Sequence, residues 1–123
     1  MYTFKKDGQT EDLIESIRQY KQDESLSGLM ILTGDESSCD RNKISEYLKS
    51  EDLTVFGGIF PQVVSGGENF TAGHVVVPFY ATEFAQLTIE NLSAKTSDEL
   101  DEILESVDSS DFDTAYVFVD GLT

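Results

Sequence analysis

The chain has 123 residues, of which 39% are hydrophobic, and this length accommodates one domain with a real core but no second domain. Its 24 acidic and 8 basic residues give a net charge of −16, and so acidic a surface repels phosphate backbones and anionic lipid headgroups. Nucleic acids and membrane surfaces are therefore disfavoured as partners, whereas cationic or zwitterionic ligands, basic proteins, or solubility alone would account for the charge.

Cysteine usage and the hydropathy pattern predict a cytoplasmic protein. Cys39 is the only cysteine, so neither an internal disulfide nor a cysteine-built metal site can form within one chain. A lone cysteine is typical of a reducing compartment. No apolar run approaches the roughly 18 residues of a membrane helix, and the N-terminal residues MYTFKKDGQT lack the apolar core of a signal peptide.

The first half of the chain alternates helix and strand patterns. Residues Tyr2–Phe4 could form a short strand. Apolar residues at helical spacing predict a helix over Glu11–Lys21. The continuous apolar run Gly28–Thr33 predicts a strand covered on both faces. A second helix is expected over Arg41–Lys49, followed by a strand over Leu53–Phe60.

Each of these helices has a cap residue and an inward-facing stripe. Thr10 is the expected N-cap of the first helix, and Ser38 or Asp40 that of the second. The predicted inward-facing residues are Leu13, Ile14, Ile17 and Tyr20 in the first helix and Ile44, Tyr47 and Leu48 in the second.

The second half is predicted to add three strands and one helix after an irregular stretch at Pro61–Asn69. Thr71–Phe79 and the alternating segment Phe84–Asn91 indicate an antiparallel pair of strands, because the link between them is short. Thr96–Glu99 is a capping-box pattern that opens a third helix, and Thr114–Val119 is the last expected strand. The predicted buried stripe of this third helix is Leu100, Ile103, Leu104 and Val107.

These elements together predict a fold of the α/β class. The order is α-β-α-β-β-β-α-β in one domain over residues 1–123, which indicates a mixed β-sheet with packed helices.

The glycine pair Gly57-Gly58 lies inside the most strand-like segment of the chain. Glycine weakens a strand unless the backbone bends there or another group comes close. One interpretation is a bulge or tight packing against a helix. The other is a strand surface that a ligand or partner approaches closely.

A search for catalytic residues finds no complete set. His74 is the only histidine, and its position in a predicted strand favours a packed or surface residue over a general base. Cys39 could act as a nucleophile with His74, but no third residue that would orient the pair is in the pattern. We therefore expect a non-catalytic protein.

Two acidic clusters are the only candidates for metal ligands. They are Asp35, Glu36 and Asp40, and Asp108, Asp111 and Asp113. Neither has the spacing of a calcium-binding loop. We interpret both as solvated faces and expect neither a metal nor a cofactor.

Two segments, Thr54–Phe79 and Val117–Thr123, resemble the N-terminal part of the FIST family over roughly residues 27 to 123. The matching features are the glycine pair Gly57-Gly58, Gly73, the valine run Val75–Val77 and the Asp120–Leu122 segment. The chain departs from the family at Phe60-Pro61, where many members have a small polar pair.

The resemblance implies a cytoplasmic sensory input domain of a signal-transduction protein, with amino acids among the small ligands proposed for the family. Family modules are normally longer, so the chain is expected to be part of a sensory module or a small stand-alone relative. The expected ligand-binding residues are Thr33, Gly57, Gly58, Asp120 and Gly121, which would meet at strand ends.

Two other functions remain open from the sequence. A protein-interaction module would use an exposed sheet edge or the wet face of Phe84–Asn91, with a signalling protein or a second copy of the chain as partner. A small enzyme that uses Cys39 is the third hypothesis.

Overall fold

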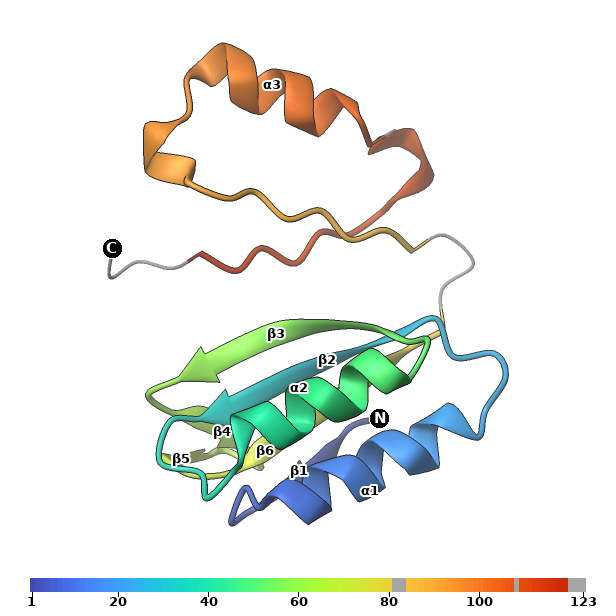
Figure 1. Cartoon of the computed structure of the whole chain (residues 1–123), viewed down its shortest axis with the longest axis vertical. Helices are drawn as coiled ribbons and strands as arrows, with labels where there is room; N and C mark the ends of the chain where they lie inside the picture. The colour runs from blue at the N-terminus through green and yellow to red at the C-terminus, as the bar shows by residue number, and fades with distance from the viewer. Residues whose placement is uncertain (81–83, 108, 120–123) are drawn as a thin grey trace. The chain divides into compact units, whose positions relative to one another are not determined.

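A computed structural model of the chain describes residues 1–80, 84–107 and 109–119 (Figure 1). The chain divides into two compact units, Met1–Thr82 and Glu83–Thr123. The mixed α/β class expected from the sequence is confirmed.

The first unit is built on a four-stranded mixed sheet. In spatial order the strands are β1 (Thr3–Lys5), β6 (His74–Phe79), β2 (Gly28–Gly34) and β3 (Thr54–Phe60). β2 and β3 run parallel, whereas β6 is antiparallel to both β1 and β2. The apolar run at Gly28–Thr33 is therefore an interior strand, as its pattern predicts.

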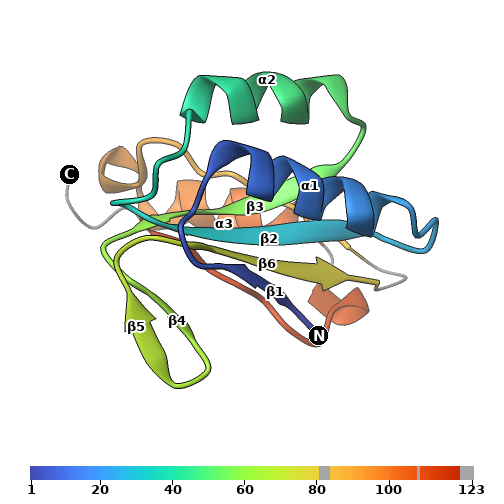
Figure 2. The ribbon, with the colours of Figure 1, turned by 90° about the horizontal axis from the view of Figure 1, so that it is seen from below.

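Two helices, α1 (Thr10–Lys21) and α2 (Arg41–Ser50), connect the strands of the sheet and lie on the same side of it (Figure 2). α1 follows β1 and leads to β2, and α2 follows β2 and leads to β3. Parallel strands need such crossover helices, since a short turn cannot return the chain to the starting edge.

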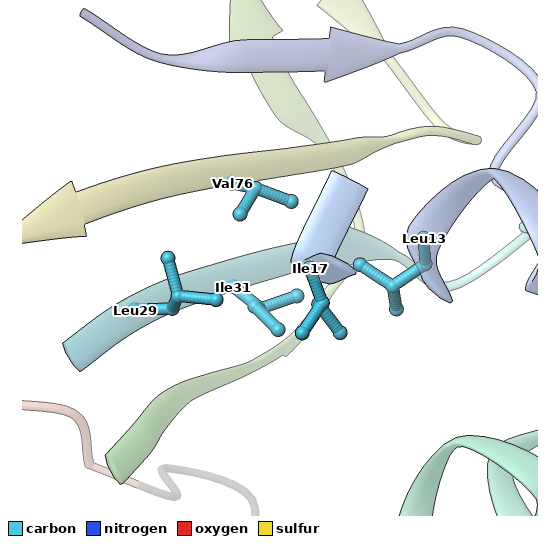
Figure 3. Close-up of a cluster of buried hydrophobic side chains, with 5 residues drawn as sticks. All are labelled: Leu13, Ile17, Leu29, Ile31 and Val76. Atoms are coloured by element: carbon cyan, nitrogen blue, oxygen red, sulfur yellow. The ribbon is translucent and has the colours of Figure 1, made fainter. Parts of the chain in front are cut away.

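The hydrophobic core lies between these helices and the sheet. Five side chains from α1, β2 and β6 form its buried centre (Figure 3), namely Leu13, Ile17, Leu29, Ile31 and Val76. Tyr20 and the α2 residues Ile44, Tyr47 and Leu48 pack against this cluster, so the predicted inward faces of both helices are confirmed.

The two helix starts differ from each other. Asp40 caps α2 as expected, because its Oδ1 accepts hydrogen bonds from the backbone N–H groups of Asn42 and Lys43, both at 3.1 Å. The prediction that Thr10 is the N-cap of α1 is wrong. Gln9 is the N-cap of α1, and the Thr10 hydroxyl instead accepts a 2.7 Å hydrogen bond from the backbone N–H of Asp40.

A small hairpin replaces the irregular stretch predicted for Pro61–Asn69. Its strands are β4 (Val63–Ser65) and β5 (Glu68–Phe70), which pair antiparallel on the side of the sheet opposite the helices (Figure 2). Gly66 and Gly67 form the two-residue turn with φ angles of 59° and 79°, as a type I′ hairpin requires.

The predicted hairpin of Thr71–Phe79 with Phe84–Asn91 is wrong. β1 and β2 pair with opposite sides of β6 over His74–Val76, so the local alternation at Phe84–Asn91 identified the wrong neighbour. Among the described residues, Phe84–Asn91 contains no strand. A period of two shows which side chains share a face, but a strand also needs a partner at its edge.

The second unit contains α3 (Ser97–Glu105) between two single-turn helices, η1 (Leu92–Ala94) and η2 (Ser109–Asp111). Its capping box is confirmed, whereas the predicted burial of its apolar stripe is wrong, because no residue of α3 is buried. The strand expected at Thr114–Val119 is not formed either.

In the part of the chain that the structure describes, no helix has the length and apolar character needed to cross a membrane.

Candidate functional site

The loop that follows β2 is fixed at the carboxyl ends of the two parallel strands. The backbone N–H of Asp35 donates to the carbonyl of Phe60 at 2.8 Å, which joins the loop to the end of β3. The N–H of Glu36 donates to the carbonyl of Thr71 at 3.0 Å, and that of Gly34 to the carbonyl of Gly73 at 2.9 Å. Ligands of open α/β sheets usually bind at this end of the strands.

Ser37 fastens the same loop to the entry of β6. Its Oγ accepts a hydrogen bond from the N–H of Gly73 at 2.9 Å and donates to the carbonyl of that residue at 3.3 Å. Gly8 packs directly against Ser37, since a Cβ at Gly8 would lie 2.2 Å from the Ser37 Oγ. We name the surface formed by Gly34–Cys39, Phe60 and Thr71–Gly73 the strand-end edge.

Two carboxylates, those of Asp35 and Glu36, project from the strand-end edge and are exposed. Asp40, the third acidic residue of the loop, has a structural task as the cap of α2. The strand-end edge therefore presents negative charge to solvent on a backbone that is held by other elements. Such an arrangement favours a cationic or zwitterionic group over an anion.

His74 is fully buried and both of its ring nitrogens are engaged. Nε2 lies 3.2 Å from the carbonyl oxygen of Gln9 and Nδ1 lies 3.0 Å from the hydroxyl of Thr33. A carbonyl can only accept, so we assign the proton to Nε2 and a hydrogen bond from Thr33 to Nδ1. Burial lowers the pKa of His74, which favours this neutral form. The expectation of a packed histidine is confirmed.

Cys39 is half-buried at the end of the same loop. Burial, and secondarily the carboxylate of Asp40, raise the pKa of its thiol, although a hydrogen bond with Thr10 opposes this. Because the thiolate is the nucleophile, these surroundings reduce the reactivity of Cys39 at neutral pH.

The glycine pair lies in the middle of β3 and has a local explanation. Gly57 pairs with Ile31 of β2 and has a φ of 139°, a value that favours glycine. A Cβ at Gly57 would lie 1.9 Å from the carbonyl oxygen of Ile31. The neighbouring strand therefore requires this glycine, whereas the nearest neighbour of a Cβ at Gly58 would be the Phe60 ring, at 3.4 Å.

Three of the predicted ligand residues lie on adjacent strands. Thr33 is one residue from the carboxyl end of β2 and pairs with Ile59, whereas Gly57 and Gly58 pair with the two residues before Thr33. Asp120 and Gly121 lie outside the described residues, so their expected approach to the strand ends stays a prediction.

The acidic clusters do not assemble into a metal site among the residues at 1–80, 84–107 and 109–119. Asp108 lies outside these ranges, and Asp111 and Asp113 are exposed.

Sequence reasoning missed the residues that hold the strand-end edge in place. Ser37 and Gly73 are 36 residues apart, and nothing in the sequence near either one indicates that they meet. The hairpin turn at Gly66-Gly67, in contrast, could have been predicted from the sequence, because paired glycines between two short β-type runs are typical of a hairpin.

Comparison with known proteins gives no relative, since neither a protein-family model, a curated protein nor a solved structure matches the chain.

Proposed function

We propose that the chain is a sensory input domain that binds a small metabolite at the strand-end edge, with an amino acid as the first class to test. The observation that carries this proposal is the fixed loop after β2, which holds Asp35 and Glu36 at the carboxyl ends of two parallel strands. The resemblance to the FIST family supports the same function.

The charge of the strand-end edge suggests the chemistry of the ligand. An ammonium group is complementary to Asp35 and Glu36, but one exposed ion pair contributes only about 0.2–1 kcal/mol. Most of the affinity would therefore come from backbone carbonyl oxygens of the loop, since its N–H groups at residues 34–37 already donate within the fold. These carbonyl groups lose little entropy on binding because the loop is already held in place.

Of the residues predicted from the sequence, Thr33 lies nearest the strand-end edge, and its hydroxyl is fixed by the hydrogen bond with His74. Gly57 lets β3 run close to β2. In this proposal Asp35 and Glu36 contact the ligand beside Thr33, whereas Gly57 and Gly58, in the middle of β3, do not contact it.

The surroundings of His74 and Cys39 favour binding over catalysis. His74 is buried and neutral, with both ring nitrogens occupied, so it is not placed to remove a proton from a bound molecule. The raised thiol pKa of Cys39 disfavours the nucleophilic thiolate.

The test is a thermal-shift and calorimetric screen of the 123-residue chain with a panel of amino acids and amines at low salt. A ligand that binds the folded chain raises the melting temperature, and a hundredfold excess over Kd corresponds to about 2.7 kcal/mol. The Asp35→Asn, Glu36→Gln double variant should reduce this shift, because the ion pairs with the ammonium group are lost while the backbone contacts remain. Its matched control is Glu24→Gln with Asp52→Asn, two exposed residues away from the loop. No shift across the panel, or equal loss in the control, would contradict the proposal.

A protein-interaction module is the second candidate, and β3 is the feature that favours it. β3 is at one end of the sheet order, its sequence TVFGGIF contains neither charge nor proline, and Ile59 is 46% exposed. An exposed apolar side chain such as Ile59 is a typical contact for a protein partner. An oligomer by light scattering that Ile59→Lys dissociates would support this function, and a monomer at all concentrations and at high salt would contradict contact with a second copy through Ile59.

A further inference from the structure

We propose that α3 is a docking surface for a basic amphipathic segment of a partner protein. This inference goes beyond ligand binding and does not rest on it, because it concerns the second unit and uses none of the residues of the strand-end edge.

α3 begins at a complete capping box, and none of its side chains is buried. The hydroxyl of Thr96 accepts a hydrogen bond from the N–H of Glu99 at 3.2 Å, and the Glu99 carboxylate accepts one from the N–H of Thr96 at 3.0 Å. This capping box satisfies backbone donors that a helix end otherwise leaves open. The start of α3 is thus fixed by local hydrogen bonds, while its side chains are available for contacts.

One side of α3 presents apolar groups beside an open hollow. Leu100 and Ile103 are half-buried, and Leu104, one helical turn from Leu100, is 55% exposed. The hollow has a volume of about 460 Å³, and its lining is Lys95, Glu99, Glu102, Ile103 and Ser106. Ile103 is the only apolar residue in this lining, so a long basic side chain from a partner could lie across the open hollow while an apolar one covers Leu104.

The charged side chains of α3 itself all have one sign. α3 carries five carboxylates and no basic residue, the five being Asp98, Glu99, Asp101, Glu102 and Glu105. Lys95 is the only lysine or arginine in the sequence after Lys49. In the first unit, by contrast, Glu11 pairs with Lys43 and Glu51 pairs with Lys21. The second unit therefore has a single lysine, Lys95, for the five carboxylates of α3.

Charge complementarity indicates which kind of partner would bind α3. A second copy of the chain carries a net charge of −16 as well, and repulsion between like charges opposes its approach. A small cation would make no apolar contact with the exposed side chain of Leu104. A segment that combines lysine or arginine with leucine-like side chains at helical spacing satisfies both the carboxylates and the apolar groups.

The experiment measures binding of a fluorescently labelled amphipathic peptide of lysine and leucine to the full chain by anisotropy, with amide chemical shifts to locate it. Leu104→Ser should weaken binding about tenfold, because an apolar anchor is lost. Its matched control is Val64→Ser on β4, where the side chain is 63% exposed, and this change should leave affinity within about twofold.

A charge-neutralising pair tests the electrostatic part without loss of helix propensity. Glu102→Gln with Glu105→Gln should lower affinity several-fold and reduce its salt dependence, since glutamine is as good a helix former as glutamate. Glu15→Gln with Glu46→Gln removes the same charge from exposed positions on α1 and α2. Equal weakening by this control pair, or chemical-shift changes that lie outside Lys95–Ser106, would overturn the proposal and leave only attraction by net charge.

The outcome is separable from that of the ligand proposal. The α3 variants should keep any thermal shift given by amino acids, and the Asp35→Asn, Glu36→Gln variant should keep peptide binding. An amino-acid screen without a hit therefore leaves the α3 result standing, and a failed peptide titration leaves the ligand result standing.

Discussion

The hydroxyl of Thr33 and the Nδ1 atom of His74 lie 3.0 Å apart across the antiparallel pair of β2 and β6. The other ring nitrogen of His74 meets the carbonyl of Gln9, the N-cap residue of α1. One buried imidazole therefore connects two strands and a helix start, and its protonation state affects all three.

The stability of the fold should depend on pH through His74. Its ordinary pKa is 6.5, and burial lowers the pKa in the folded chain. As pH falls below 6.5, the unfolded chain binds the proton first, so the free energy of unfolding decreases. Stability from this residue is complete above 6.5 and is lost as pH falls towards the folded pKa.

The measurement is urea unfolding of the wild type and of His74→Gln between neutral pH and pH 5. Carboxylates titrate in both proteins, so the difference between the two curves isolates the imidazole. We expect that difference to shrink as the pH falls, and a constant difference would show that His74 does not titrate in this range.

Gly57→Ala should destabilise the chain strongly. The new Cβ would clash with the carbonyl oxygen of Ile31 at a backbone φ of 139°, and we expect a loss of more than about 2 kcal/mol in the free energy of unfolding. Gly58→Ala is the control, because its Cβ would stand 3.4 Å from a side-chain ring. Chemical denaturation measures both. If Gly57→Ala were as stable as Gly58→Ala, a ligand contact would become the better explanation for the glycine.

Cys39 should react slowly with thiol reagents at neutral pH. Burial raises the pKa of its thiol, so the thiolate fraction is smaller than in an open peptide. The rate of reaction with a disulfide reagent should rise at alkaline pH and should rise further in urea, where the burial is removed. A folded chain that reacts faster than the unfolded one at pH 7 would revive the nucleophile hypothesis.

Added salt should raise the melting temperature. At a net charge of −16, repulsion between carboxylates destabilises the compact state, and the Debye length falls from about 10 Å at 0.1 M to about 3 Å at 1 M ionic strength. Salt also weakens the exposed pair of Glu11 and Lys43, which is a smaller effect in the opposite direction. A scan of melting temperature in sodium chloride tests this, and a melting temperature that falls throughout would mean that attractive pairs dominate.

Local signals in the sequence were sufficient for the helices and not for the sheet. The Asp40 cap, the Thr96–Glu99 box and the inward residues of α1 and α2 depend on neighbours within a few positions, so their patterns could be recognised. The pairing of β6 depends on β1, about 70 residues earlier, and no local pattern specifies that partner. The strand predicted at Phe84–Asn91 failed for the same reason.

The candidate site divides in the same way. Thr33 could be placed near a strand end because the apolar run before it was evident. Ser37 could not be connected with Gly73, since their hydrogen bonds exist only after β6 has joined the sheet.

The position of β6 between β1 and β2 has a consequence for synthesis on the ribosome. Thr3 pairs with Val76, so the first strand has no partner in the sheet until residues near the end of the first unit have emerged. β2 and β3 can pair before that, which leaves one side of β2 open while the chain grows. Closure of the sheet is therefore a late, long-range event, and chains that stop short of β6 expose an apolar strand to their neighbours.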